Sequence, residues 1–257
     1  MKFDMHCHTK NGSIDSKVNL ERYISLLKKK NFDGLMITDH DSYRGCRAWD
    51  KIKNDPKNKD FVVLKGIEYD TKDSGHILVI MPDNLYLPVL CLRGMALKRL
   101  IKIVHCFGGI LGPAHPYGVE SSSAMFFKKL RENPDIIRKF DFIETFNTCE
   151  SPLSNIRAKA LADDYGKPGI GGTDAHTEKY AGMACTEISV NIRSNNDFIR
   201  AVRSGAYINS SGSERKETIK SIHKSKRYAV WGFKAYNRGL GYLFSPYRSY
   251  KIKKLAI

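Results

Sequence analysis

Histidine and carboxylate side chains occur in closely spaced pairs along this 257-residue chain. His6 and His8 flank Cys7 at positions i and i+2, and Asp174 and His176 have the same spacing. Residues two apart on a strand project to the same face, so each pair can present two donor atoms together. Mixed imidazole and carboxylate donors suit Zn²⁺, Mn²⁺ or Fe²⁺, and without cysteine ligands they do not indicate a structural zinc site.

Residues of the same types occur at or near the ends of other predicted strands. Asp39 and His40 follow a strand, Glu68 and His115 close one, His76 begins one, and Glu144 lies within one. Of the eight histidines, only His105 and His223 fall outside this pattern. A single histidine at a strand end is more often a hydrogen-bonding or exposed residue than a ligand, but chance is a poor explanation for six. The set exceeds the ligands that one metal ion needs, so we expect two or three ions.

Strand-like apolar segments alternate with amphipathic helical segments, which predicts an α/β fold with a parallel sheet or barrel. Strands are predicted at 2–7, 33–38, 61–69, 76–81, 109–115, 140–147, 168–176 and 183–190. Helices are predicted at 18–31, 90–106, 122–132, 152–165 and 195–203. The loops that follow parallel strands meet at one face, where they would bring the histidines and carboxylates together.

Charge divides the chain into a mildly basic body and a strongly basic C-terminal segment. The chain has 43 Lys and Arg against 27 Asp and Glu, a net charge of +16. Residues 218–257 contain basic residues and no acidic residue, with Tyr, Trp and Phe interleaved. This composition suits nucleic acid, because rings stack on bases and cations meet phosphates. Docking of the rings onto the body, with the lysines in water, is the simpler alternative.

We place a boundary near residue 213, between a body of residues 1–212 and a basic, aromatic-rich extension of residues 213–257. Glycines in the extension disfavour one long helix, so we expect a broken helix against the body and then an extended, strand-like end. The basic and aromatic residues of the extension would also suit an anionic membrane surface.

Composition also limits the class of protein. No run approaches 18 consecutive apolar residues, which excludes a membrane-spanning helix among the segments of this sequence. The first residues lack the apolar core of a signal peptide, so we do not expect secretion by that route. The six cysteines are scattered without a CxxC pair, which is typical of reduced thiols and favours a cytoplasmic location.

Seven motifs stand in an order found in one known family: DMHCHTKNGSID, TDHD, GIEYD, GHILV, GPAHP, IETFN and GGTDAH. On these motifs the chain resembles the PHP (polymerase and histidinol phosphatase) family from about residue 3 to residue 190. The resemblance implies a distorted (β/α)7 barrel, here with a basic C-terminal extension. It also implies a centre of two or three divalent metal ions that hydrolyses phosphate esters.

The ligands that the resemblance implies fall into three clusters. The first is His6, His8, Glu68 and Asp174; the second is Glu68, His76 and His115, with Glu68 bridging; the third is Asp15, His40 and His176. All nine positions hold residues that can bind a metal, which favours an active three-metal member of the family.

Other residues of the motifs have less direct roles. The loop that carries Asp15 is one residue longer than in many relatives, and Ser13 is the competing residue there. We expect Asp39 to orient His40 or His8 from outside the ligand set, and Glu144 to act in the same way or structurally.

The implied chemistry is an in-line attack on phosphorus by a metal-bound hydroxide held by Glu68. His40 and His176 are the candidate acids for the leaving group. For substrate binding, Lys10 and Arg44 are the candidate phosphate ligands, and Tyr69 and Asn147 the candidates for contact with the leaving group. Each of these substrate-binding candidates could equally be an ordinary surface residue.

The substrate class stays open at this point. The basic composition fits a phosphomonoester, a nucleotide or an oligonucleotide, and equally any phosphorylated small molecule. Protein-tyrosine phosphatase and histidinol phosphatase activity are alternatives within the enzyme class. A non-catalytic protein that binds nucleic acid or an anionic surface on the same scaffold is the alternative outside it. Loss of catalysis usually shows as substituted ligands, and none is substituted here.

Overall fold

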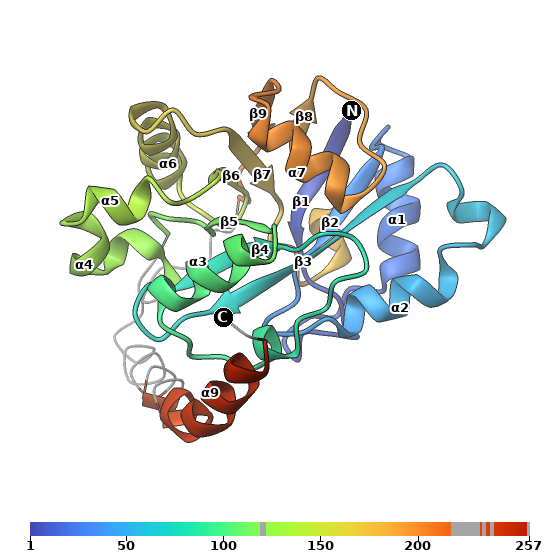
Figure 1. The fold of residues 1–257 in the computed structure, drawn as a ribbon. Coiled ribbons are helices and arrows are strands. Elements are labelled where there is room, and N and C mark those ends of the chain that lie inside the picture. The colour runs from blue at the N-terminus through green and yellow to red at the C-terminus, as the bar shows by residue number, and fades with distance from the viewer. Residues whose placement is uncertain (119–121, 217–231, 233–234, 237–238, 256–257) are drawn as a thin grey trace.

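The computed structural model describes residues 1–118, 122–216, 232, 235–236 and 239–255 (Figure 1). The strands are β1 (Lys2–Cys7), β2 (Gly34–Ile37), β3 (Val62–Asp70), β4 (His76–Ile80), β5 (Ile110–Pro113), β6 (Ile143–Asn147), β7 (Gly169–Gly172), β8 (Ala184–Ile188) and β9 (Ile208–Gly212). The α-helices are α1 (Leu20–Lys28), α2 (Arg44–Ile52), α3 (Leu97–Cys106), α4 (Lys128–Arg131), α5 (Pro134–Ile137), α6 (Pro152–Asp164), α7 (Asn195–Arg203) and α9 (Ser245–Lys254).

Seven strands form a mixed sheet in the order β5-β4-β3-β2-β1-β8-β9, and β6 and β7 form a separate parallel pair. Two hydrogen bonds join this pair to the sheet. Asp141 N, just before β6, donates to Leu111 O of β5, and Gly171 N of β7 donates to Thr186 Oγ1 of β8. The sheet is therefore a curled half-barrel, and the β6–β7 pair connects its two sides (Figure 1).

The predicted parallel sheet is parallel only in part. Strands β1, β2 and β3 are parallel, but β3–β4, β4–β5, β1–β8 and β8–β9 are antiparallel pairs. The reason for the first reversal is the short link between β3 and β4, which occupies only residues 71–75. A parallel return needs a crossover of a dozen or more residues, whereas a short link allows only an antiparallel neighbour.

Side chains alternate along the strands and divide the core into two clusters. Met5 of β1 and Met36 of β2 pack in the same cluster as Phe198 of α7. Leu35 of β2 belongs to the other cluster, with Leu27 of α1. Both faces of the central strands are thus buried, which is why these strands are almost continuously apolar.

Two predicted helices are shorter than expected. In the 90–106 segment the α-helix begins only at Leu97, after a 3-10 turn at Pro88–Cys91. Gly94 has φ of +84°, a left-handed conformation that a helix cannot pass through. In the 122–132 segment the described residues form a 3-10 turn, Ala124–Phe126, and the short α4, because Phe127 has an extended backbone between them.

The expected strand-like C-terminal end is wrong, because Ser245–Lys254 is the helix α9. Pro246 stands in its first turn, where a missing N–H group costs no hydrogen bond. Residues 217–231, for which we expected part of a broken helix, lie outside the described residues. Helices α2 and α5 and strand β9 were not predicted. Among the described residues no helix is long and apolar enough to cross a membrane.

Candidate metal centre

The residues of the predicted centre come from β1, β3 and β4 and from the segments that follow β1, β2, β5 and β7. Two isolated bridges, His40 with Glu68 and Cys7 with Ala175, continue the parallel pairing past the regular strands. They draw the segments after β2 and β7 against β3 and β1. Residues that are far apart in the sequence therefore meet at one end of the sheet, as expected for loops that follow parallel strands.

Glu68 lies at the centre of the cluster and is 1% exposed. Its Oε1 atom is 2.9 Å from His76 Nδ1 and 3.1 Å from His115 Nε2. Its Oε2 atom is 3.2 Å from His8 Nε2 and 3.1 Å from His40 Nδ1. The two oxygens thus face different histidines, which is the arrangement that a carboxylate bridging two ions requires.

A second carboxylate, Asp174, lies beside His6 of β1 and His8, which directly follows β1. Its Oδ1 atom is 3.2 Å from His8 Nε2 and 3.7 Å from His6 Nε2, and His6 Nε2 is 3.5 Å from Glu68 Oε2. Asp174 has φ of +48°, which is rare for a residue other than glycine. The structure therefore brings together all four residues of the first predicted cluster.

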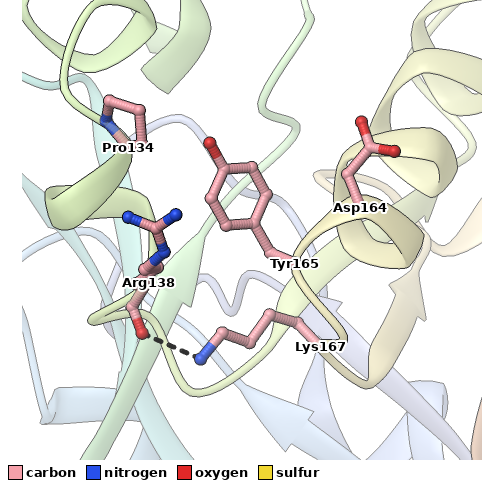
Figure 2. Close-up of a pocket in the computed structure, with 5 residues that line it drawn as sticks. All are labelled: Pro134, Arg138, Asp164, Tyr165 and Lys167. Carbon is pink, nitrogen blue, oxygen red and sulfur yellow. Dashed lines mark hydrogen bonds between the residues drawn. The ribbon is translucent and has the colours of Figure 1, made fainter.

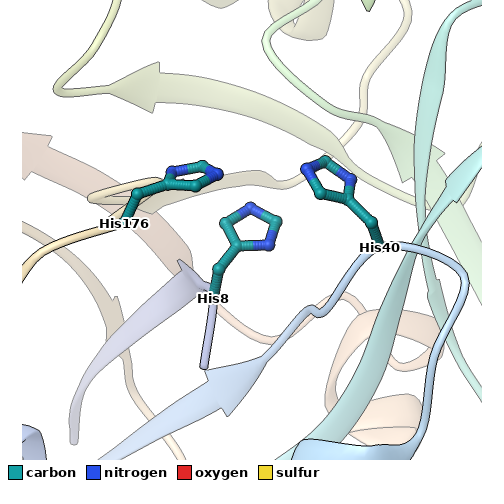
Figure 3. Close-up of side chains that lie close together, drawn as sticks. All are labelled: His8, His40 and His176. Carbon is teal, nitrogen blue, oxygen red and sulfur yellow. The ribbon is translucent and has the colours of Figure 1, made fainter. Parts of the chain in front are cut away.

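The residues of the third predicted cluster meet at the more open side. Asp15 Oδ2 is 3.2 Å from His176 Nε2 and 3.6 Å from His40 Nε2, and the Asp15 side chain is 52% exposed. Figure 3 shows the rings of His8, His40 and His176 turned toward one another from three segments of the chain. One nitrogen of each lies within 4.8 Å of the others. Solvent and a ligand could reach the cluster from this side.

Hydrogen bonds on the outer side fix the tautomers of two histidines. His6 Nδ1 is 2.9 Å from Glu144 Oε1, and His176 Nδ1 is 3.1 Å from the backbone oxygen of Asp174. Both partners are acceptors, so each Nδ1 carries the proton and donates it. The lone pair of each Nε2 then faces the interior of the cluster, as a metal ligand requires.

His8 is oriented by a relay through a serine. His8 Nδ1 lies 3.1 Å from Ser13 Oγ, and Ser13 Oγ donates to Asp39 Oδ1 at 3.1 Å. Thr9 donates to the same carboxylate from its backbone N–H at 2.6 Å. Asp39 therefore acts on His8 through Ser13, the residue that competed with Asp15 as a ligand on sequence grounds.

Burial and charge oppose each other at the ionisable groups. Burial lowers the pKa of His6 and His8, but the carboxylates around them outweigh it, so both lie above their ordinary value, that of His8 at about 9. Burial raises the pKa of Glu68 and the imidazoles outweigh it, so it lies well below its usual range. Burial holds the pKa of His40 below its ordinary value. The cluster thus favours ionised carboxylates and calls for positive charge.

The donor set fits divalent cations. His6 Nε2 and His176 Nε2 face carboxylate oxygens, so a divalent cation between them would take the place of an Nε2 proton and bind both kinds of donor. The buried His40 Nδ1 has no hydrogen bond within the described residues, although Glu68 Oε2 lies 3.1 Å away. Several divalent ions bind both imidazole nitrogen and carboxylate oxygen, so these donors do not specify one metal.

The four substrate-binding candidates lie in different surroundings. Lys10 and Arg44 are exposed. The Tyr69 hydroxyl is directed away to the backbone, where it donates to Leu92 O at 2.5 Å. Asn147 lies at the cluster, with Nδ2 3.4 Å from Asp174 Oδ2. The structure therefore brings Asn147 beside the predicted ligands and directs the Tyr69 hydroxyl elsewhere.

Sequence reasoning missed a buried charged group beside His76. Arg93 Nη2 is 2.5 Å from Asp70 Oδ2, and Arg93 Nε is 3.3 Å from Asp41 Oδ2. Asp70 Oδ1 lies 3.9 Å from His76 Nε2. Burial, and then the charge of Asp70, raise the pKa of Asp41 to about 8. The motifs TDHD and GIEYD contain both aspartates, but Arg93 lies in a segment that was expected to be helical.

A second missed residue, Asp4, holds the turn that precedes Asp174. Thr173 donates to Asp4 from its backbone N–H at 2.9 Å and from its hydroxyl at 2.7 Å, and the Tyr23 hydroxyl donates at 2.7 Å. Asp4 stands two residues before His6 on β1, so strand alternation could have placed it on the same face.

A separate cavity of about 630 Å³ lies away from these residues, between the α5 region and the end of α6. It is lined by Pro134, Arg138, Asp164, Tyr165 and Lys167 (Figure 2). Lys167 Nζ donates to Arg138 O at 2.8 Å. None of the predicted site residues lines it.

Comparison with known proteins agrees with the motifs. Residues 152–207 match the family model described as PHP-associated. A comparison with curated proteins gives no match. The fold is similar to that of PsfC from Pseudomonas syringae, with 17% identity, a TM-score of 0.61, and coverage of 93% of this chain and 98% of that chain.

Two further solved structures share the fold. One is a candidate metal-dependent phosphoesterase from Bifidobacterium adolescentis, with 15% identity, a TM-score of 0.57, and coverage of 79% of this chain and 95% of that chain. The other is Endonuclease Q in complex with a 27-mer duplex substrate that has an abasic lesion at the active site. There the identity is 17%, the TM-score is 0.62, and the match covers 83% of this chain but 60% of the endonuclease.

The match of residues 152–207 to a PHP-associated family model and the shared α/β fold of these structures make the chain similar to PHP-type proteins. The resemblance that the seven sequence motifs indicate is thereby confirmed.

Proposed function

We propose that the protein is a phosphoric ester hydrolase that works with two or three divalent ions, of Mn²⁺, Zn²⁺ or Fe²⁺ type. The observation that carries the proposal is the buried Glu68 carboxylate, whose two oxygens face separate sets of imidazoles. The names of two structural relatives, a phosphoesterase and an endonuclease, support the same reaction class. The proposed ligands are His6, His8, Asp15, His40, Glu68, His76, His115, Asp174 and His176.

Divalent ions, when bound, would polarise a phosphate ester and lower the pKa of water toward neutrality. The residues of the chain then have separate tasks. Glu68 fixes the distance between the histidines that face its Oε1 atom and those that face its Oε2 atom. Glu144 orients the ring of His6, and Ser13 orients the ring of His8, so that the Nε2 atoms point inward. His40 or His176, at the more open side, is the residue that we propose to hold the proton for the leaving group where it is not itself bound to a metal ion.

The substrate that we propose is a phosphomonoester, a nucleotide or an oligonucleotide. The duplex in the Endonuclease Q complex makes nucleic acid a reasonable member of this set. The distorted (β/α)7 barrel, the division at residue 213 and a cytoplasmic location belong to the same proposal. A non-catalytic binding protein is disfavoured, because every proposed ligand position has kept a residue that can bind metal.

The test combines metal analysis with a substrate panel. The protein, purified without added metal, should contain two or more divalent ions per chain. With Mn²⁺ it should turn over at least one of p-nitrophenyl phosphate, a nucleoside bisphosphate, an oligonucleotide, an abasic duplex, a phosphotyrosine peptide or histidinol phosphate. Glu68→Gln should lose metal and turnover together, whereas Glu187→Gln, at an exposed position of β8, should keep both.

Two results would overturn the proposal. One is the absence of turnover on the whole panel with Mn²⁺, Zn²⁺, Fe²⁺ and Mg²⁺ each supplied. The other is a stable fold that binds none of these ions. The latter would favour the non-catalytic alternative.

A further inference from the structure

Helix α9 is attached to the body by one face. Arg248 is 4% exposed and donates from Nη2 to the backbone oxygens of Leu92 and Arg93, the former at 3.3 Å. Ile252 and Leu255 follow at i+4 and i+7 and pack against the hydrophobic core. Positions with this spacing lie on one face of a helix. The apolar face of α9 is therefore already covered by the body.

A neighbouring face of α9 combines tyrosine and lysine. Tyr247, Tyr250, Lys251 and Lys254 stand at i, i+3, i+4 and i+7, which again describes one face. Tyr247 is 50% exposed and Tyr250 is 52% exposed. Lys251 Nζ lies 5.3 Å from the Tyr247 ring centroid, and Lys254 Nζ lies 4.7 Å from that of Tyr250. Each ring is thus accompanied by a cation and remains accessible to solvent.

A third pair of the same kind lies beside the loop that receives Arg248, because Lys72 N donates to Met95 O. Tyr242 is 74% exposed, and Lys72 Nζ lies 5.9 Å from its ring centroid. Lys72 comes two residues after Asp70, the last residue of β3 and a neighbour of His76. The loop that receives Arg248 is also bonded there, because Gly94 N donates to Asp70 O at 2.8 Å. The tyrosine and lysine pairs therefore begin close to the strand that carries Glu68.

We define the α9 surface by its three pairs: Lys72 with Tyr242, Lys251 with Tyr247, and Lys254 with Tyr250. We propose that the α9 surface binds single-stranded nucleic acid and guides a polynucleotide substrate to the metal centre. This deepens the proposed function and rests on it.

The chemistry of the α9 surface favours this ligand over others. Exposed rings stack on unpaired bases, and the ammonium groups beside them suit the phosphates between those bases. The bases of a duplex are stacked on one another and could not reach the rings. An anionic membrane is less favoured, because Ile252 and Leu255 face the body and the outer face has no aliphatic side chain among its four residues. Residues 218–257 contain no acidic residue that would repel phosphate.

The experiment measures binding of a fluorescein-labelled oligothymidylate to the full chain by anisotropy, with a chelator present so that the strand is not cleaved. The test variant carries Tyr247→Ala with Lys251→Gln. The matched control carries Tyr207→Ala with Lys159→Gln, an exposed tyrosine and an exposed lysine outside α9. Thermal melting of both variants should match that of the wild type, because Tyr247, Tyr207 and Lys159 are exposed and Lys251 is only half-buried.

The test variant should bind the strand about tenfold more weakly than the wild type, and the control should bind like the wild type. The slope of log affinity against log salt should become shallower by about 0.7, since one phosphate contact is lost. Tyr247→Phe should retain binding, because stacking needs the ring and not the hydroxyl. Turnover of p-nitrophenyl phosphate should be unchanged in every variant.

The proposal is overturned if test and control variants bind the strand equally. It is also overturned if the test variant loses only binding to phosphatidylglycerol vesicles, or if it changes only the oligomeric state. The outcome is separable from the proposed function. Strand binding that falls in the test variant of a protein without turnover would retain the α9 surface and reject the hydrolase.

Discussion

Glu144→Gln is the substitution that tests most directly how the centre is held. Glu144 accepts hydrogen bonds from His6 Nδ1 at 2.9 Å and from the backbone N–H of His115 at 2.6 Å. Asn147 Nδ2 lies 3.3 Å from both carboxylate oxygens. All three neighbours are donors. Glutamine has nearly the same shape, but its amide NH₂ must face one of them, where donor would meet donor.

The magnitude follows from these contacts. A hydrogen bond to a charged group contributes about 1.5 to 3 kcal/mol, roughly twice a neutral one. The substitution loses one such bond and turns the other into a neutral bond. We therefore expect the metal-free protein to be less stable by about 2 to 4 kcal/mol. Loss of the partner that orients a histidine ligand lowers metal affinity by about 10- to 100-fold, so His6 should bind metal that much more weakly.

Urea unfolding with a chelator present measures the first effect, and competition with a chromophoric chelator measures the second. Glu187→Gln, on the exposed side of β8, is the control and should change neither quantity. Unchanged stability and unchanged metal affinity in Glu144→Gln would refute the reasoning. Complete loss of metal, as expected for Glu68→Gln, would make Glu144 a direct ligand.

Three further substitutions probe the surroundings of the centre. In Gly172→Ala, the new Cβ would clash with the backbone nitrogen of His6, so metal affinity should fall at least about tenfold and stability by about 1 to 3 kcal/mol. Burial raises the pKa of Asp50, but the hydrogen bond from Lys65 lowers it by more, so the pKa of Asp50 lies below its ordinary value. Asp50→Asn should therefore destabilise at pH 7, by less than about 1 kcal/mol at this partly exposed site, and the loss should shrink as pH falls below about 4. Arg248→Met leaves two backbone acceptors without their charged donor, so unfolding should cost about 1 to 3 kcal/mol less and proteases should release α9 faster.

Each of these has a control and a result that contradicts it. Gly232→Ala meets nothing within 4 Å and should not disturb metal binding; equal effects of both glycine variants would contradict the clash at His6. Asp60→Asn removes an exposed carboxylate; a loss in Asp50→Asn that persists at low pH would contradict the ion pair. Arg99→Met removes an exposed arginine; wild-type protease resistance in Arg248→Met would show that other contacts hold α9.

The sequence predicted the early strands and α1 well, because their patterns are local. In α1, Leu20, Tyr23, Ile24 and Leu27 are buried at helical spacing, and Asn19 caps the helix by accepting from the next turn. The mixed sheet and the helical end of the chain were not predicted. The direction in which two strands pair depends on which strands meet in the folded chain. The helix α9 is held on the body through Arg248, a contact that its own sequence does not reveal.

The sequence predicted which residues would lie together at the candidate site more completely than it predicted the sheet that holds them. Histidine and carboxylate are conspicuous as residue types, and the β1 alternation alone placed His6 and His8 on one face. The role of Arg93 beside Asp70 could not be read in the same way. A buried ion pair between a strand and a distant loop leaves no periodic signal in either segment.

The sequence by itself determined which donor atoms this protein has and in what order they follow its strands. The tertiary structure decided which of them meet. The division of the two Glu68 oxygens between separate histidines depends on the register of β1, β2 and β3. His115, with φ of +29°, and Asp174 both have a left-handed backbone, which fixes the positions of their donor atoms. Neither residue type prefers this conformation locally. The physical reason is that strand register and strained turns are fixed by contacts between distant segments, whereas residue type and alternation belong to the chain alone.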